Sequence, residues 1–452
     1  MRDFFKLKEH GTTVKQEISG GVVTFLTMAY IIFVNPQILS EAGMDKGAVI
    51  TVTCLAAFIG TMIVALWANV PFAMAPGMGL NAFFTYTLVM QKGMSWQTAL
   101  GIVFLSGVIF LILTILGIRE KVVNAIPISI RLAIAAGIGL FITFIGFKNM
   151  GLIVSNPATL VGLGKFNTPV LLGLVGLVTI AVLDVKKIKG SILWGIIITT
   201  ILGIIFKVVT LPAINFTTAA SFIDKISLFI NSIVSMPASI EPTMFKLDIK
   251  TALQISFIGP IFSFMFMDLF DSVGTIVACS YEAGMVQRDG TIKKIDKMLE
   301  ADAIATLVGA LLGTSTTTTY IESASGIGNG ARTGLSSIVT ALLFVAALFF
   351  APVIGIVPAF ATAPALIIVG VYMFRNIKNI DFSDFEVSLP SFLIIIIMPL
   401  TSSISMGLTF GFLSYIIIAL ASGDFKKISP VTWIIGFFAA LNLIFEMGLN
   451  VL

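Results

Sequence analysis

The sequence carries little charge, and this scarcity limits the classes of protein to which it can belong. Charged residues make up 11% of the 452 residues, whereas a soluble globular domain carries roughly 25%. Hydrophobic residues make up 57%, and the mean hydropathy is +1.06. The composition excludes an ordinary soluble domain and predicts an all-α polytopic membrane protein whose surroundings are the lipid bilayer. The net charge of +4 is unremarkable, and we expect no nucleic-acid partner.

Histidine and cysteine are also nearly absent. The single histidine, His10, precedes the first apolar run, which leaves no histidine for a metal site or an intramembrane proton relay. The two cysteines, Cys54 and Cys279, lie inside apolar runs, where we expect them to pack as small apolar side chains. The glycine-rich stretch 326–330 lacks the lysine of a phosphate-binding loop. We therefore expect no cofactor, no metal and no enzymatic activity.

Long apolar runs are abundant and fall into two groups. A membrane-spanning helix needs roughly 17–25 mostly apolar residues. The first group lies near 17–39, 48–68, 78–91, 96–117, 127–147, 168–184 and 191–209. After a more polar stretch at 210–249, the second group lies near 251–282, 299–312, 319–330, 334–355, 358–374, 389–404, 406–421 and 431–449. An odd number of crossings before the polar stretch means that the second half starts from the opposite face, so a repeat of the first half must be inverted.

Basic residues between the runs predict the orientation. Loops on the cytoplasmic side carry an excess of Lys and Arg. Four basic clusters fall on one side of the membrane if the N-terminus is cytoplasmic: Arg119/Lys121, Lys186/Lys187/Lys189, Arg288/Lys293/Lys294/Lys297 and Arg375/Lys378. We therefore predict a multi-pass protein of the cell membrane with a cytoplasmic tail at 1–16 and an extracellular connector at 210–249.

Two polar interruptions, one in each half, are the most informative feature of the chain. Segments 71–81 and 313–323 lie where a membrane helix is expected, and neither can be an unbroken one. Non-helical backbone at membrane depth is tolerated only where it is buried in protein or lines a cavity. A matched pair of interrupted segments in two halves indicates the central binding site of a transporter.

The run 264–275 carries two carboxylates inside an apolar segment. Asp268 lies about 17 residues into its run, or about 25 Å along a helix, which places it near the middle of the bilayer. An aspartate there costs at least ~2.5 kcal/mol and usually faces a cavity or a partner. The spacing places Asp271 on the same helix face, and Thr275 continues that face. The alternative is a carboxylate bonded to backbone or hydroxyl groups inside the bundle.

The second interruption offers another acid and the first offers an amide. Glu322, which we count as the third intramembrane carboxylate, is expected near the start of a short helix, where free N–H groups favour its ionised form. The threonine run 316–319 suits an extended strand that leads into this helix. In the first interruption Ala75 allows close approach to the backbone, and Asn81 supplies donors and an acceptor. The alternatives are a helix-capping role for Glu322 and an interhelical hydrogen bond for Asn81.

These motifs resemble those of the AzgA-like purine permeases, a branch of the nucleobase–cation symporters. The resemblance covers essentially the whole chain and rests on four ordered segments, 24–36, 75–84, 264–275 and 320–335. It implies fourteen spans in two inverted seven-span repeats, with two broken half-helices preceded by short strands. It also implies a core domain (17–117 and 251–355) and a gate domain (127–209 and 358–449), with the substrate between them.

The resemblance also implies roles for single residues. Asp271 matches an acid that hydrogen-bonds the base, Glu322 matches a residue that contacts it, and Gly79 and Asn81 match positions implicated in purine transport. Asp268 remains an alternative to Asp271 for the direct contact. Nearby candidates for the substrate site complete the set: Ala75, Thr275, Tyr320 and Ser323. Thr275 departs from relatives of pyrimidine or xanthine type that carry histidine or aspartate there.

We therefore predict a secondary active transporter that imports purine nucleobases (hypoxanthine, guanine or adenine) by proton symport, with an elevator-like movement of the core against the gate. Sodium stays open as the coupling ion, and the sequence leaves a homodimer open. An anion or other small-solute transporter of the same fold is the alternative, although it should carry cationic or neutral donors at the breaks. An ion channel would better suit polar groups repeated along a path.

Overall fold

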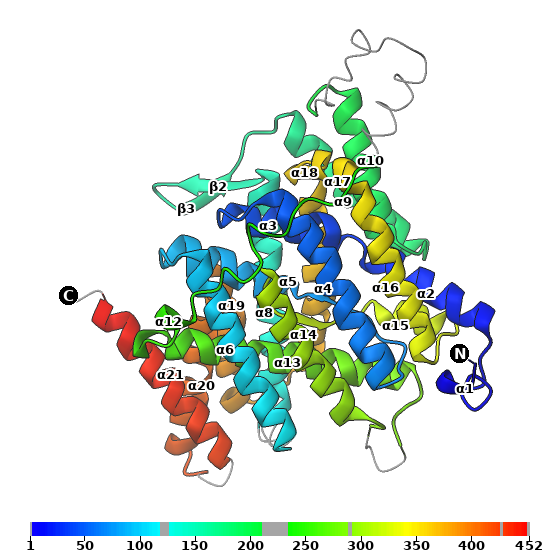
Figure 1. Cartoon of the computed structure of the whole chain (residues 1–452). Coiled ribbons are helices and arrows are strands. Elements are labelled where there is room, and N and C mark those ends of the chain that lie inside the picture. The colour runs from blue at the N-terminus through cyan, green and yellow to red at the C-terminus, as the bar shows by residue number, and fades with distance from the viewer. Residues whose placement is uncertain (1, 118–125, 210–233, 288–291, 425–427, 450–452) are drawn as a thin grey trace, which may run out of the picture.

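A computed structural model describes residues 2–117, 126–209, 234–287, 292–424 and 428–449, and these are almost entirely helical (Figure 1). In the first half the elements are α1 (Arg2–Phe5), α2 (Val14–Met28), α3 (Ile31–Glu41), α4 (Lys46–Trp67), β1 (Met74–Pro76), α5 (Met78–Ala82), the π-helix η1 (Phe83–Gln91), α6 (Trp96–Ile115), α8 (Ile128–Met150), β2 (Ile153–Asn156), β3 (Leu160–Leu163), α9 (Thr168–Val185) and α10 (Ser191–Ile205). In the second half they are α12 (Ile249–Ala252), η3 (Ile255–Phe257), α13 (Ile258–Glu282), α14 (Ile295–Leu312), β4 (Thr317–Thr319), α15 (Ser323–Gly328), α16 (Gly334–Ala347), η4 (Leu348–Phe350), α17 (Ala351–Ile356), α18 (Ala359–Phe374), η5 (Arg375–Asn379), α19 (Phe385–Thr401), α20 (Ile404–Ala421) and α21 (Pro430–Leu449).

Nine helical stretches among the described residues are long and apolar enough to cross a membrane. They are Val14–Glu41, Lys46–Trp67, Trp96–Ile115, Ile128–Met150, Thr168–Val185, Ile255–Glu282, Gly334–Ile356, Ala359–Asn379 and Ile404–Ala421. Shorter apolar helices occur at Ser191–Ile205, Phe385–Thr401 and Pro430–Ile444. The prediction of a mostly helical polytopic membrane protein is confirmed. The total of fourteen spans stays a prediction, because α21 follows as a further apolar helix.

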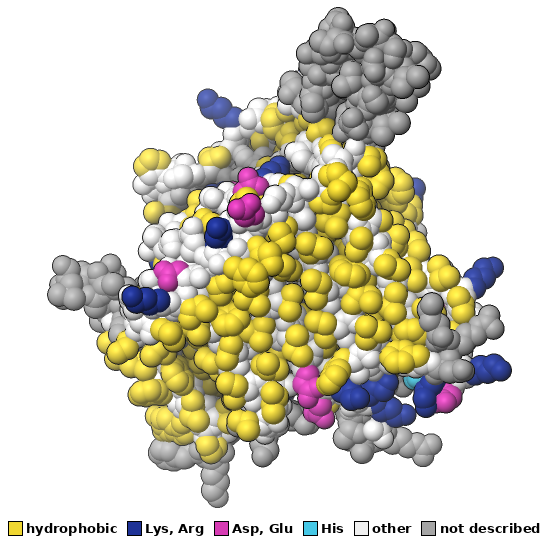
Figure 2. All heavy atoms as spheres, viewed as in Figure 1, with side chains coloured by type: hydrophobic (Ala, Val, Ile, Leu, Met, Phe, Trp, Pro, Cys, Tyr) yellow, Lys and Arg dark blue, Asp and Glu magenta, His cyan; other side chains and the backbone are white. Residues whose placement is uncertain are grey.

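The surface suits a bilayer. Hydrophobic side chains cover the broad middle of the visible face, and most of the charged side chains on it lie toward its edges (Figure 2). Large apolar side chains such as Ile115, Val185 and Phe437 are exposed, which lipid accommodates and water would not. Of the residues that predicted the orientation, Arg119, Lys121 and Arg288 lie outside the described residues, as does most of the 210–249 connector.

Polar N-caps mark where the apolar helices begin. Thr13 forms a capping box with Gln16 at the start of α2, and the Asp45 carboxylate accepts from the Ala48 N–H at 2.7 Å at the start of α4. Ser95 and Asn167 cap α6 and α9 in the same way. Each cap satisfies an N–H group that the first turn of a helix leaves without an intrahelical partner.

The two interruptions pair with each other as a two-stranded antiparallel sheet. β1 and β4 match Met74 with Thr319, Ala75 with Thr318 and Pro76 with Thr317, and both strands are fully buried. The ladder continues through the Gly77 N–H to the Thr316 carbonyl at 2.9 Å. This pairing satisfies backbone groups that lipid could not, so the predicted strands before the two short helices are confirmed.

The remaining helices pack in two groups, and the first of them contacts the pair of strands through α4 and α14. α16 packs on α2 and α4, and α14 packs on α4 and α6. In the other group α8 packs against α18 and α19, and α9 lies against α10 and α18. α21 lies at the edge of the molecule against α20 and α13 (Figure 1). The division into core and gate domains, with the boundaries given above, stays a prediction.

Candidate functional site

Both short helices start from the paired strands, so the two interruptions form one structural unit. α5 follows β1, and α15 follows β4. The Tyr320 hydroxyl donates to the Pro76 carbonyl at 2.6 Å, and the Ser323 hydroxyl accepts from the Ala73 N–H at 3.0 Å. Tyr320 and Ser323 therefore bond the two breaks together, and Ala75 pairs with Thr318 in the sheet between them. The role of these three residues in a substrate site stays a prediction.

Asp271 is half-buried on α13 and faces the start of α5. A Cβ added to Gly77 would lie 3.7 Å from its Oδ2 atom, and only 2.9 Å from the Thr318 methyl group. The glycine therefore lets the two breaks and the carboxylate come close together. Thr275 lies one turn further along α13 and is also half-buried.

Asp268 has a different environment, although it lies only three residues away. Its side chain is 1% exposed. The Thr306 hydroxyl of α14 donates to it at 3.2 Å, and the Ser272 hydroxyl lies 3.5 Å from its other oxygen. This matches the alternative of a carboxylate bonded to hydroxyl groups inside the bundle. Of the two aspartates, Asp271 is the more accessible at the breaks.

Asp302 of α14 is a further intramembrane carboxylate that we did not predict, and counting Glu322 as the third one was wrong. Asp302 is fully buried. It accepts from the Ser272 hydroxyl at 2.5 Å and from the Thr319 N–H at 3.0 Å. The available signal was an aspartate inside the apolar run 299–312, the same signal that identified Asp268. Asp302 thereby ties α13 and α14 to the strand β4.

Glu322 lies directly before α15, as predicted, but its side chain does not cap that helix. Its Oε1 atom accepts a hydrogen bond of 2.6 Å from the Tyr30 hydroxyl instead. Tyr30 lies in the break between α2 and α3, a region for which the sequence predicted one continuous run. The capping role is therefore not what the structure shows. The carboxylate is half-buried, and its second oxygen can still accept a hydrogen bond.

Asn81 and Gly79 lie on α5, on the side of the first interruption. Asn81 is fully buried, and its Oδ1 atom accepts from the Ser315 hydroxyl. Its Nδ2 atom has no hydrogen-bond partner among the described residues. The alternative of an interhelical hydrogen bond therefore explains the amide oxygen of Asn81 and leaves its N–H donor unexplained. A Cβ at Gly79 would lie 2.6 Å from Ile138 of α8, so the glycine permits close packing there.

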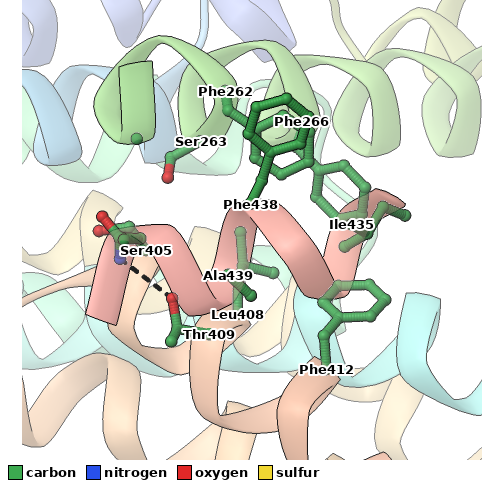
Figure 3. Close-up of a pocket in the computed structure, with 12 residues that line it drawn as sticks. Phe262, Ser263, Phe266, Ser405, Leu408, Thr409, Phe412, Ile435, Phe438 and Ala439 are labelled. Atoms are coloured by element: carbon green, nitrogen blue, oxygen red, sulfur yellow. Dashed lines mark hydrogen bonds between the residues drawn. The ribbon is translucent and has the colours of Figure 1, made fainter. Parts of the chain in front are cut away.

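A small pocket lies elsewhere, between α13, α20 and α21. Phe262 and Phe266 of α13 project toward Phe438 of α21, with Phe412 of α20 below them (Figure 3). Phe262 stacks on Phe438 with ring centroids 4.7 Å apart. The lining is aromatic and aliphatic, with hydroxyl groups and the amide of Asn442, and it contains no charged group. The carboxylates that suit the N–H donors of a polar ligand lie at the paired breaks and not in this pocket.

Comparison with known proteins places this arrangement among transport proteins. The model of the permease family matches residues 15–410. The chain is 46% identical to permease MJ0326 of Methanocaldococcus jannaschii, covering 98% of both chains. It is 40% identical to the adenine permease AdeP of Escherichia coli, covering 98% of this chain and 95% of that one. It is also 40% identical to the guanine/hypoxanthine permease PbuG of Bacillus subtilis, covering 98% and 99%.

A solved structure shares the fold at low identity. The transmembrane domain of the cyanobacterial bicarbonate transporter BicA superimposes with a TM-score of 0.59 at 14% identity, covering 86% of this chain and 96% of that chain. This likeness concerns the arrangement of the helices alone.

Proposed function

Because this chain belongs to the permease family, we propose that it is a secondary active transporter that imports purine nucleobases across the cell membrane. It is a multi-pass membrane permease and not an enzyme. Its relatives include permeases named for adenine and for guanine/hypoxanthine, which confirms the family identified from its motifs. These names support purines as the substrate class here.

One observation carries the proposal: two half-buried carboxylates, Asp271 and Glu322, lie at the paired breaks. Asp271 lies on α13 and Glu322 directly before α15, and Asp271 lies against Gly77 where the backbone turns into α5. Guanine and adenine present ring and exocyclic N–H donors, and hypoxanthine presents ring N–H donors. A carboxylate oxygen accepts such donors in short, strong hydrogen bonds. A base that loses a donor leaves a buried acceptor unpaired, so such a site rejects it strongly.

The same acids argue against an anion as substrate. An anion-binding site offers cationic or neutral donors, whereas these breaks carry acidic side chains. The fold shared with a bicarbonate transporter does not change this argument, because the identity is only 14% and function depends on the site and not on the fold.

For the coupling ion we assign a proton, held by Asp268 together with Asp302. The Ser272 hydroxyl contacts both carboxylates but has a single proton to donate. Two acids around one hydroxyl resist simultaneous ionisation, which favours a shared proton. Sodium bound by the same oxygens is the competing assignment.

We propose that transport requires the helices that carry the breaks to move together, as one rigid unit, relative to the group of α8, α9, α18 and α19. Two hydrogen bonds join these groups at one end: the Thr87 hydroxyl donates to the Ser402 carbonyl at 2.6 Å, and the Gln91 amide donates to the Thr401 carbonyl at 3.2 Å. An elevator-like movement would have to break them. We also propose that the N-terminus lies on the cytoplasmic side of the membrane.

Uptake assays test the substrate class. Purified protein in liposomes should accumulate radiolabelled hypoxanthine, guanine or adenine, and unlabelled purines should compete while uracil and bicarbonate should not. Accumulation of bicarbonate or another anion without any purine uptake would contradict the proposal.

A further inference from the structure

Tyr30 is the strongest unexplained feature near the paired breaks. It lies in the two-residue turn between α2 and α3, where its backbone keeps helical dihedral angles, and its side chain is 1% exposed. Its hydroxyl donates to Glu322 Oε1 at 2.6 Å and so joins two residues that lie 292 positions apart in the sequence. A phenol hydroxyl is costly to bury without a partner, so this hydrogen bond fixes both side chains relative to each other.

The backbone around this pair is held by very close helix packing. A Cβ at Gly20 of α2 would lie 2.6 Å from the Cβ of Ala331, and one at Gly326 of α15 would collide with the Thr24 hydroxyl. Two glycines facing each other allow α2 and α15 to approach at backbone distance. Tyr30 and Glu322 are therefore attached to two elements that have little freedom to shift relative to each other.

A buried acid forms hydrogen bonds at the other end of the interface between α2 and α15. Glu17, in the first turn of α2, is fully buried and accepts from the Arg332 N–H at 2.9 Å and from the Thr333 hydroxyl at 2.9 Å. It also accepts from the Ser336 N–H at 3.2 Å, in the first turn of α16. The span formed by α2 and α3 is thus bonded to the chain on both sides of α15, at Glu17 and at Tyr30.

We propose that Tyr30 is the positioning residue for Glu322 and thereby sets the purine affinity of the site. The hydroxyl occupies Oε1 and fixes the side-chain torsions of Glu322, so that Oε2 faces the base in one orientation. Without the hydroxyl the carboxyl group samples several rotamers, and only some of them meet the N–H donors of the base. The inference rests on the proposed function, because it takes Glu322 as a group that contacts the base.

Tyr30→Phe tests this with a conservative change. Binding of radiolabelled hypoxanthine to purified protein should weaken about tenfold, as expected for one lost hydrogen bond to a charged group. The KM for uptake should rise with the dissociation constant, while the maximal rate per molecule in the membrane should stay unchanged. A purely structural role would lower the amount of folded protein and leave KM unchanged, which would overturn the inference.

Tyr86→Phe is a matched control. Tyr86 is also buried, and its hydroxyl accepts from Asn149, which in turn donates to the carboxylate of Glu41 at 3.4 Å. Its removal deletes the same phenolic hydroxyl from a different, part-buried cluster that consists of an amide and a carboxylate. Hypoxanthine affinity should be unaffected in Tyr86→Phe, and an equal loss of affinity in both variants would overturn the inference.

Thermal unfolding tests the Tyr30–Glu322 hydrogen bond independently of transport. Tyr30→Phe should lower the melting temperature of the unliganded protein but should not lower it further in a Glu322→Ala background, because the partner is already gone. Equal destabilisation in both backgrounds would overturn the pairing. If wild-type protein bound no purine at all while this stability coupling held, the proposed substrate would fail and the Tyr30–Glu322 pair would stand.

Discussion

Asp271 and Glu322 are the residues on which the substrate proposal depends, because both are acidic, half-buried and placed at the paired breaks. Asp271→Asn and Glu322→Gln each keep the shape of the side chain but replace an acceptor with a donor. We expect each to weaken purine uptake roughly 10- to 100-fold, the range for hydrogen bonds to charged groups, with normal membrane insertion. Glu300→Gln is the control, since Glu300 contacts the Trp67 indole at 2.8 Å at an exposed position. Unchanged affinity in either variant would remove that residue from the site.

Asn81 poses a separate question, because only one of its two polar atoms is explained. Its Oδ1 accepts from Ser315, and its Nδ2 has no partner among the described residues. We expect Asn81→Ala to change the order in which purines compete for uptake, because the free donor is available to an acceptor of the base. Ser315→Ala removes the same internal hydrogen bond and is the matched control. If both variants showed the wild-type order of competition and only lower expression, Asn81 would have a packing role alone.

Single residues also show where sequence reasoning stops. Asp271, Glu322 and Tyr320 were identified because polar groups are rare in apolar runs. Asp302 carried the same signal, yet a run with charges at its start makes one further acid easy to overlook. Tyr30 carried no such signal, since a tyrosine in an apolar segment is ordinary. Its importance depends on a contact with Glu322, 292 positions away.

Among the elements, β4 was predictable and the local geometry of the helices was not. The threonine run 316–319 favours extended backbone because β-branched side chains suit strands, and the structure places β4 there. The break at Tyr30 and the π-helix η1 left no periodic pattern in so apolar a sequence. In η1 the extra residue in each turn is stabilised by tertiary contacts, such as that of Thr87 with Ser402.

The contact between α2 and α15 makes a prediction at the same scale. Gly326→Ala should destabilise the protein by about 1–3 kcal/mol, the typical cost of overpacking, because the new Cβ would collide with Thr24 of α2. Gly328→Ala is the control in the same short helix, where the nearest atom is a carboxylate oxygen of Glu282 at 3.6 Å. Thermal unfolding in detergent measures both, and equal melting temperatures for the two variants would contradict the packing argument.

At the scale of the whole molecule, the elevator proposal requires contacts such as Gln91–Thr401 to break in each transport cycle. The two native cysteines are buried, so added cysteines can be cross-linked selectively. We expect a short bifunctional thiol reagent to arrest uptake in a Gln91→Cys/Thr401→Cys variant, and each single variant to continue transporting after the same treatment. Uptake at the full rate in the cross-linked protein would mean that these two groups of helices do not move apart there.

Energy coupling is also a property of the whole molecule, because under the proposed symport a proton taken up on one side must be released on the other. Asp268 and Asp302 both contact the Ser272 hydroxyl, and Asp302 also accepts from the Thr319 N–H of β4. Two acids that contact one hydroxyl group suit a single shared proton. Rehydration of this region after movement would favour its release.

In sodium-free liposomes we therefore expect an inwardly directed proton gradient to stimulate purine uptake and a protonophore to abolish the stimulation. Asp268→Asn should still bind purine but should lose the response to the gradient, because an amide cannot carry the proton. Glu300→Gln should respond as the wild type does, since Glu300 lies outside the buried network. Strict dependence on added sodium, with no response to the proton gradient, would mean that the carboxylate oxygens of Asp268 and Asp302 bind sodium and not a proton.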